Sequence, residues 1–332
     1  MADKPFPILF IAGTRIGDAV LSSGLIKRLH DEIPHARFTI AAGPPAAPLF
    51  VETPNLDQVI VMTKRKWAGH WIALWSKVRA RRWGLIVDMR GSGVSRFLST
   101  RRRAIYHRNP SAPPVHKVIE AARVLRVEDD PPNPYLFTSP EIEQAAADYL
   151  GAGHGPILAV APGANWIGKT WPAERFAETA ARLLAHDGPL PDGRLLILGS
   201  SADREAGRAL KLAVSRDRII GGEPGKLDLL TTYACLKRVR LFIGNDSGAM
   251  HLAAAAGAPT LGLFGPSDER LYGPWGLDGR AVRGPRDLDA IRRGDPELNQ
   301  AVCHMFDLSV EVVGEAAAAL LKDTEARFVQ DL

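Results

Sequence analysis

The chain has 332 residues, of which 46% are hydrophobic and 24% charged, a composition that excludes a largely disordered protein. Its length exceeds the roughly 250 to 300 residues at which a single hydrophobic core stops growing, so we expect two domains. Lys and Arg outnumber Asp and Glu by 42 to 37, and much of the excess lies between Lys64 and Arg108. This distribution predicts an anionic partner for the first half of the chain.

The first apolar run is interrupted by Gly13 and Arg15 and lacks a small-residue cleavage site, which indicates a first strand and not a signal peptide. No stretch approaches the roughly 18 apolar residues of a membrane-spanning helix, so we expect any membrane association to be peripheral. The two cysteines, Cys235 and Cys303, make neither a disulfide framework nor a zinc set. A reducing, cytoplasmic compartment is therefore expected.

Short apolar segments alternate with longer helical patterns, which predicts an α/β fold with parallel sheets. A proline-rich segment at 128–140 interrupts both patterns and marks the approach to a linker. We expect two Rossmann-like halves that bind ligands beyond the carboxyl ends of their strands. The expected strands are 7–12, 38–43, 58–62 and 84–89 before the linker, and 157–162, 194–199, 218–220, 241–245 and 259–265 after it.

The loop after the first expected strand brackets a strand-to-helix turn with Gly13 and Gly17, and Asp18 falls at or near the start of the helix. A carboxylate there could act as a base. It could equally be a helix N-cap or first-turn acid, which the helix dipole stabilises by about 1 kcal/mol. The glycine spacing does not form GxGxxG, which argues against a dinucleotide-dependent dehydrogenase.

The segment Gly163–Thr170 matches the P-loop pattern GxxxxGK[ST] and follows an expected strand. Bulky Trp166 in the loop and Pro172 at the start of the next helix weaken a P-loop nucleotidase interpretation. The glycine-containing turn, the following helix start and the cation of Lys169 could still form a diphosphate site. The alternative is that Lys169 is a solvated surface lysine.

A third candidate is the segment GNDSGAMH at 244–251, where a strand ends and a helix begins. Its amides suit a phosphate or sugar hydroxyls, and Ser247 and His251 are spaced to share one side of the first turn. Asp246 as an N-cap and His251 as a packing residue remain alternatives. Ser247 lacks the GxSxG elbow, so a serine hydrolase is not indicated.

The segment 64–83 predicts a basic amphipathic helix whose aromatic stripe includes Trp67, Trp71 and Trp75. Packing on a sheet explains the tryptophans, whereas the surrounding cations suit phosphates or carboxylates of an acceptor, or an anionic membrane. Nucleic acid is not indicated, because no known reader motif occurs. The basic residues singled out are Lys64, Arg65, Lys66, Arg101, Arg102, Arg103, Arg108 and Lys117.

Three segments together resemble glycosyltransferase family 9: GDAVLSSGLIKRL at 17–29, APGANWIGKTWPAERFAE at 161–178 and FIGNDSGAMHLAAAAGAPTLGLFGPSDE at 242–269. The segment 303–321 is also similar to that family's C-terminal stretch. The resemblance implies a GT-B fold with two facing Rossmann-like domains, an acceptor-binding domain over 1–145 and a donor-binding domain over 146–332. It also implies that the last helix packs back on the first domain.

The resemblance implies that Asp18 is the base of an inverting transfer and that Lys169 neutralises charge on the leaving nucleotide diphosphate. It places the donor at Gly163, Ala164, Asn165, Asp246, Ser247, Gly248 and His251. Ser247 stands where a threonine is frequent, and Ala164 and Asn165 where hydroxyl residues are, which leaves the donor preference open. Asp203 is a ribose partner by analogy with other nucleotide-binding folds.

The resemblance further implies ADP-heptose as donor, and an anionic lipopolysaccharide core at the inner face of the inner membrane as acceptor, bound by Lys64, Arg65, Lys66, Arg103, Arg108 and Lys117. No acid cluster has metal-ligand spacing, so we expect catalysis without a bound metal or other cofactor. We also expect the protein to be a monomer. Two further hypotheses stay open at this point. One is a P-loop ATPase or kinase, and the other is a noncatalytic nucleotide- or glycan-binding protein on the same scaffold.

Overall fold

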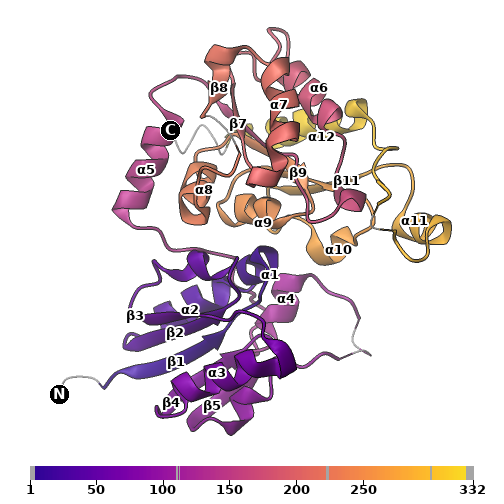
Figure 1. The fold of residues 1–332 in the computed structure, drawn as a ribbon. Helices are drawn as coiled ribbons and strands as arrows, with labels where there is room; N and C mark the ends of the chain where they lie inside the picture. Colours follow the sequence, from indigo (N-terminus) through magenta and orange to yellow (C-terminus); the bar gives the residue numbers. More distant parts are fainter. Residues whose placement is uncertain (1–3, 110, 112, 222–223, 300, 327–332) are drawn as a thin grey trace. The chain divides into compact units, whose positions relative to one another are not determined.

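A computed structural model describes residues 4–109, 111, 113–221, 224–299 and 301–326 of the chain (Figure 1). The chain divides into two compact units, Met1–Ser139 and Pro140–Leu332. The boundary lies six residues before the predicted one at 145/146, because α5 (Pro140–Leu150) packs on α8 (Leu229–Leu236) of the second unit.

The first unit is built on a five-stranded parallel sheet with the order β3-β2-β1-β4-β5. All six residues of β4 are buried, because a parallel sheet is covered on both faces. The strands are β1 (Phe6–Ile11), β2 (Ala36–Ala42), β3 (Leu56–Val61), β4 (Trp83–Asp88) and β5 (Thr100–Ile105). The helices are α1 (Ile16–Leu21), α2 (Gly24–Glu32), α3 (Gly69–Val78) and α4 (Lys117–Ala122), with short 3-10 helices at Ala47–Phe50, Lys66–Ala68 and Val94–Phe97.

The second unit has a six-stranded parallel sheet with the order β11-β10-β9-β6-β7-β8. Its strands are β6 (Ile157–Ala161), β7 (Arg194–Ile197), β8 (Ile219–Ile220), β9 (Leu241–Asn245), β10 (Thr260–Phe264) and β11 (Gly279–Arg283). Besides α5 and α8, its helices are α6 (Ala173–Leu183), α7 (Arg204–Ala213), α9 (Gly248–Ala255), α10 (Glu269–Tyr272), α11 (Leu288–Gly294) and α12 (Val310–Asp323). The predicted α/β class with two parallel sheets is confirmed.

The last helix of the described chain, α12, belongs to the core of the second unit. It contacts α6, β9, β10 and β11, and its buried side chains are Val310, Val313, Ala317, Leu320 and Leu321. These residues form the apolar stripe of an amphipathic helix, which covers the second sheet. Packing of the last helix on the first domain stays a prediction.

Each sheet contains a point where the chain reverses the direction in which strands are added. In the first sheet this switch point lies between β1 and β4, and in the second it lies between β6 and β9. In open parallel sheets, ligands bind beyond the carboxyl ends of the strands at such points. The loops after these four strands are therefore the places to look for a functional site.

Candidate active site

An ion pair joins the two loops at the switch point of the second unit. Lys169 lies in the 3-10 turn Ile167–Lys169 after β6, and its Nζ is 2.5 Å from Oδ2 of Asp246, which follows β9. The Asp246 side chain is only 5% exposed and that of Lys169 21%. Lys169 is therefore not a solvated surface lysine, because it compensates a buried carboxylate.

His251 and the start of α9 complete this cluster. The buried His251 has its Nε2 3.9 Å from Oδ1 of Asp246, so Asp246 lies between a lysine and a histidine. Ser247 and not Asp246 is the N-cap of α9, and within the described part of the chain its buried Oγ has no hydrogen-bond partner. No side-chain cap thus occupies the first-turn amides there, as a helix start that binds an anion requires.

Asn245 fixes the Lys169 loop against the end of β9. Its side chain is fully buried, its Oδ1 accepts a hydrogen bond from the Trp171 amide at 3.1 Å, and its Nδ2 donates to the Pro162 carbonyl at 2.7 Å. The Trp171 indole donates in turn to the Leu308 carbonyl at 2.9 Å. The sequence alone assigns no role to Asn245 or Trp171. The signal that could have indicated Asn245 is its place as a polar residue at the end of an otherwise apolar strand.

The Gly163–Thr170 segment does not have the open phosphate-wrapping form of a P-loop. The Trp166 ring packs against Gly168, where an added Cβ would lie 2.0 Å from it. The Thr170 hydroxyl donates to the Trp166 carbonyl at 3.1 Å, and α6 begins only at Ala173, after Pro172. The bulky Trp166 therefore occupies this turn, and Lys169 points to Asp246.

The predicted ribose partner Asp203 has a structural role in the 3-10 helix Ser201–Asp203, directly before α7. Its Oδ2 accepts hydrogen bonds from the Ser200 amide at 2.7 Å and the Ser200 hydroxyl at 2.8 Å, in a capping box. Its Oδ1 lies 2.2 Å from where a Cβ of Gly163 would be, so a glycine is needed for this approach. Asp203 and Gly163 thus meet beside the cluster, whereas contact of Asp203 with ribose stays a prediction, as does donor contact by Ala164 and the exposed Asn165.

In the first unit, Asp18 is exposed in the first turn of α1, whose N-cap is Arg15. The N-cap interpretation of Asp18 is therefore wrong, and the first-turn position is confirmed. An added Cβ at Gly13 would lie 2.7 Å from the Asp18 Cβ, so the glycine lets the loop after β1 pass close to this residue. The carboxylate thus sits at the switch point of its own sheet, on the solvent side.

Arg90 is a residue at the same switch point that the sequence did not single out. The buried Asp88 at the end of β4 accepts hydrogen bonds from the Arg90 amide at 2.9 Å and the Ser92 amide at 2.8 Å, which shapes the turn. The Arg90 guanidinium lies 4.5 Å from the centre of the Trp71 ring. Burial lowers the pKa of Arg90, as expected for a partly desolvated cation.

The predicted acceptor-binding cations fall into two groups. Lys64, Arg65, Lys66 and Arg108 are exposed. Arg103 instead donates to the backbone carbonyls of Ser95 and Leu98, and Lys117 pairs with Glu120 at 2.5 Å. Arg103 thus ties the edge strand β5 to the loop before it, whereas the Lys117–Glu120 pair lies within α4. Acceptor contact by Arg103 and Lys117 stays a prediction.

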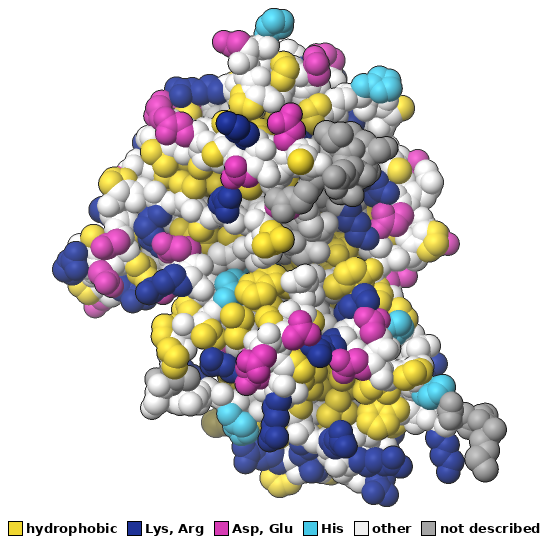
Figure 2. All heavy atoms as spheres, turned by 180° about the vertical axis from the view of Figure 1, so that it is seen from behind, with side chains coloured by type: hydrophobic (Ala, Val, Ile, Leu, Met, Phe, Trp, Pro, Cys, Tyr) yellow, Lys and Arg dark blue, Asp and Glu magenta, His cyan; other side chains and the backbone are white. Residues whose placement is uncertain are grey.

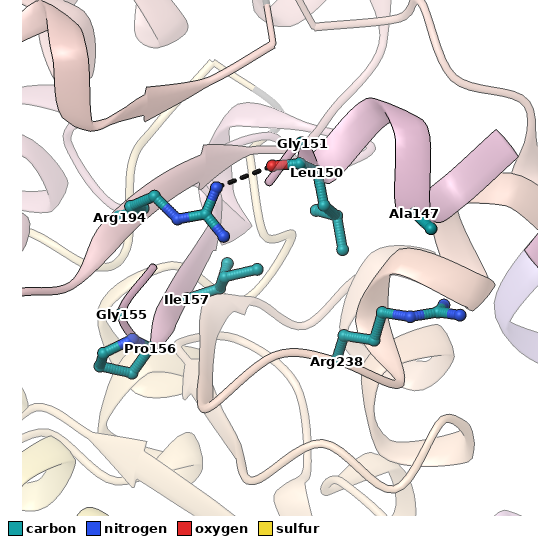
Figure 3. Close-up of a pocket in the computed structure, with 8 residues that line it drawn as sticks. All are labelled: Ala147, Leu150, Gly151, Gly155, Pro156, Ile157, Arg194 and Arg238. Atoms are coloured by element: carbon teal, nitrogen blue, oxygen red, sulfur yellow. Dashed lines mark hydrogen bonds between the residues drawn. The ribbon is translucent and has the colours of Figure 1, made fainter. Parts of the chain in front are cut away.

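A pocket of about 480 Å³ lies at the opposite end of the second sheet (Figure 3). Its lining includes Ile157 and Arg194 at the amino ends of β6 and β7, and Arg194 donates to the Leu150 carbonyl at 2.7 Å. Arg238, also at its wall, pairs with Glu143 at 3.0 Å. This pocket is remote from the carboxyl ends of the strands, so we do not assign the functional site to it.

The model of the family described as glycosyltransferase family 9 (heptosyltransferase) matches residues 53–299. The chain belongs to glycosyltransferase family 9. This membership makes it a glycosyltransferase and favours transfer over the ATPase or kinase hypothesis. Among the described residues, no group of three His, Cys, Asp or Glu side chains is placed to hold a metal ion, and no helix has the length and hydropathy of a bilayer span.

Individual proteins of this glycosyltransferase family are similar along nearly the whole chain. Lipopolysaccharide heptosyltransferase 2 of Salmonella typhimurium is 24% identical over 326 residues, covering 87% of this chain and 91% of that protein. The solved structure of E. coli ADP-heptose lps heptosyltransferase II has a TM-score of 0.73 at 22% identity, covering 96% and 100%. A family 9 glycosyltransferase from Veillonella parvula has a TM-score of 0.77 at 20% identity, covering 97% and 99%. The GT-B fold is thereby confirmed.

Proposed function

We propose that this glycosyltransferase transfers a heptose from ADP-heptose to an anionic lipopolysaccharide core, or a related glycan, with inversion at the anomeric carbon. The family membership and the heptosyltransferase names of its relatives support this choice of sugar and acceptor. The observation that carries the proposal is the Lys169–Asp246 pair at the switch point of the second unit, next to the uncapped start of α9.

The second unit supplies the donor site in this proposal. The diphosphate binds at the first-turn amides of α9, where the helix dipole and the buried Ser247 hydroxyl favour an anion. Lys169 stabilises the negative charge that grows on the leaving diphosphate. Asp246 holds Lys169, and Asp246 and His251 offer hydrogen-bonding groups to sugar hydroxyls. Neither a metal nor a cofactor is assigned a step.

The first unit supplies the base and the acceptor site. Asp18 accepts the proton of the acceptor hydroxyl as its oxygen attacks the anomeric carbon, and the bond to the ADP leaving group breaks. The exposed cations Lys64, Arg65, Lys66 and Arg108, together with Arg90, attract phosphates or carboxylates of the acceptor. A monomer at the cytoplasmic face of the inner membrane fits this assignment.

ADP release tests the proposal. The purified protein is incubated with ADP-heptose and deacylated core acceptor, and ADP is followed for the wild type and Asp18→Asn. We expect release that requires acceptor and falls about 10²- to 10⁴-fold in the variant, because general-base assistance is lost. The control is Asp31→Asn, an exposed acid of α2 that pairs with Lys27.

Three outcomes would decide between the hypotheses. Consumption of another nucleotide sugar, with ADP-heptose left unused, would refute the donor assignment and keep the family. Full activity in Asp18→Asn would refute the base. Binding of donor without turnover of any nucleotide sugar in the panel, by protein shown to be folded, would support the noncatalytic hypothesis.

A further inference from the structure

We propose that one face of the first unit docks on an anionic lipid bilayer. The face is formed by Trp67, Ile72 and Phe97 with the adjoining cations Lys64, Arg65, Lys66 and Arg96, and we call it the α3 face. The inference stands on the surface of the first unit and does not depend on the sugar that is transferred.

Three large apolar side chains of the α3 face lie almost entirely in solvent. Trp67 is 95% exposed, Phe97 79% and Ile72 68%. Ile72 lies on α3, Trp67 lies in the 3-10 turn directly before it, and Phe97 ends the 3-10 helix Val94–Phe97, which contacts α3. A group of exposed apolar side chains on adjoining elements is typical of a surface that binds a partner.

These side chains are not part of the core stripe of α3. The helix covers the sheet with Leu74 and Val78, and Trp71 and Trp75 pack against the same core. The prediction that Trp67 belongs to this stripe is wrong, because the helix does not extend back to it. Figure 1 shows α3 on the first unit, between the labels of β1 and β5.

The backbone holds Trp67 away from the core. Trp67 and Ala68 have φ angles of 54° and 56°, in the left-handed region that residues with a Cβ rarely adopt. Two such residues in succession break the helical path between Lys66 and Gly69. A strained conformation that exposes a tryptophan is more readily explained by a use for that side chain than by folding.

The charge around the α3 face selects an anionic partner. From Lys64 to Arg108 the sequence contains thirteen Lys and Arg residues and one acid, Asp88, which is buried. Figure 2 shows Lys and Arg side chains gathered at one end of the first unit. Cations beside a surface attract anionic lipid headgroups, and the attraction grows with each added Lys or Arg.

The combination of side chains favours a bilayer over a nucleic acid. Tryptophan and phenylalanine insert at the boundary between headgroups and acyl chains, and an aliphatic residue such as Ile72 gains from the same environment. Nucleic-acid binding uses aromatic stacking and cations but gains little from an exposed isoleucine. We therefore commit to lipid, and competition by nucleic acid becomes an outcome of the test.

Vesicle cosedimentation tests the inference with the full chain. Vesicles of phosphatidylcholine and phosphatidylglycerol at 3:1 are compared with phosphatidylcholine alone, for the wild type and Trp67→Ser/Phe97→Ser. We expect the wild type to bind the anionic vesicles, to bind the neutral ones more weakly, and to be released by salt. The double variant should lose about tenfold or more in partitioning, because it lacks the two aromatic side chains that the bilayer would bury.

The matched control is Leu212→Ser/Leu277→Ser, which removes two side chains of the second unit that are 81% and 85% exposed. It should partition like the wild type. ADP release with soluble deacylated acceptor should be unchanged in Trp67→Ser/Phe97→Ser, which separates a docking defect from failure of the proposed transfer. Equal partitioning of both double variants and the wild type would overturn the inference. So would anionic vesicles that bind no protein, or displacement of the protein from them by equimolar single-stranded RNA.

Discussion

The two switch points of this glycosyltransferase differ in how their polar groups are held. In the second unit, Lys169, Asp246 and Asn245 are buried or partly buried and satisfied by one another and by the backbone. In the first unit, Asp18 and the cations Lys64, Arg65, Lys66 and Arg108 are exposed. A site built from buried partners is preorganised for one ligand. Exposed side-chain charges instead attract any ligand of opposite charge. The comparison suits a fixed donor and an acceptor recognised largely by its charge.

Of the changes that test this comparison, breaking the Lys169–Asp246 pair should have the largest effect on activity. Lys169→Met removes the cation that we assign to the leaving diphosphate, and it leaves the Asp246 carboxylate buried without a lysine partner. We expect kcat/KM for the donor to fall about 10²- to 10³-fold. Steady-state ADP release measures this, with exposed Lys226→Met as the control. Activity within twofold of wild type would show that Lys169 has no part in the transfer.

The next effect concerns the scaffold beneath the donor site. Asn245→Ala leaves the Trp171 amide and the Pro162 carbonyl without their buried partner. Each group costs about 1 to 3 kcal/mol when unsatisfied, so the free energy of unfolding should fall by at least about 2 kcal/mol. Urea unfolding monitored by circular dichroism checks this against the exposed Asn109→Ala. An unchanged midpoint would mean that the loop is not held through Asn245.

A smaller effect sharpens the account of the first unit. Arg90→Gln should raise KM for an anionic acceptor about tenfold and leave donor KM unchanged, because one charge-assisted contact is lost. The control is Arg79→Gln, since Arg79 also stacks on a tryptophan of α3, 4.8 Å from the Trp75 ring centre. Acceptor and donor titrations separate the two constants. A donor-specific change would contradict the assignment of Arg90 to the acceptor.

The smallest expected effect depends on pH. Hydrogen bonds from Arg283 hold the pKa of Glu269 below its ordinary value, at the loop after β10. A carboxyl with a depressed folded pKa stabilises the fold above its unfolded pKa, and this contribution is lost as pH falls through the folded pKa. Wild type should thus be more stable than Glu269→Gln near pH 7, by less than about 1 kcal/mol, and this difference should shrink as the pH falls below the ordinary range of a glutamate. Thermal scans across this range check the convergence. A Tm difference that grows on acidification would contradict the sign.

The sequence predicted the central strands and two of the four edge strands, β3 and β8, but not β5 and β11. The strands β5 and β11 were not predicted, because they lack a continuous apolar run. β5 contains Arg101, Arg102 and Arg103, and β11 begins with Gly279 and Arg280. Both are edge strands, where one side of the backbone is unpaired and polar side chains are tolerated. Apolar periodicity, which identified the central strands, is weak at such positions.

The loops of the candidate site were predicted, whereas the partners within them were not. Lys169 and Asp246 are 77 residues apart, and only the order of β6 and β9 in the sheet brings them together. The sequence also could not predict that Arg103 bonds to backbone carbonyls or that Asp203 accepts cap hydrogen bonds. The charge of a side chain alone does not determine its partner. The position of Arg90 could not be predicted either, because its guanidinium lies over the ring of Trp71, which belongs to another element.

The central claim is that the second unit binds the nucleotide diphosphate and that the first supplies the base. Calorimetric titration with ADP tests it most directly, with the wild type, Asp18→Asn and Lys169→Met. We predict equal ADP affinity for the wild type and Asp18→Asn, and about tenfold or more weaker binding for Lys169→Met. Weakened binding in Asp18→Asn together with unchanged binding in Lys169→Met would contradict the claim.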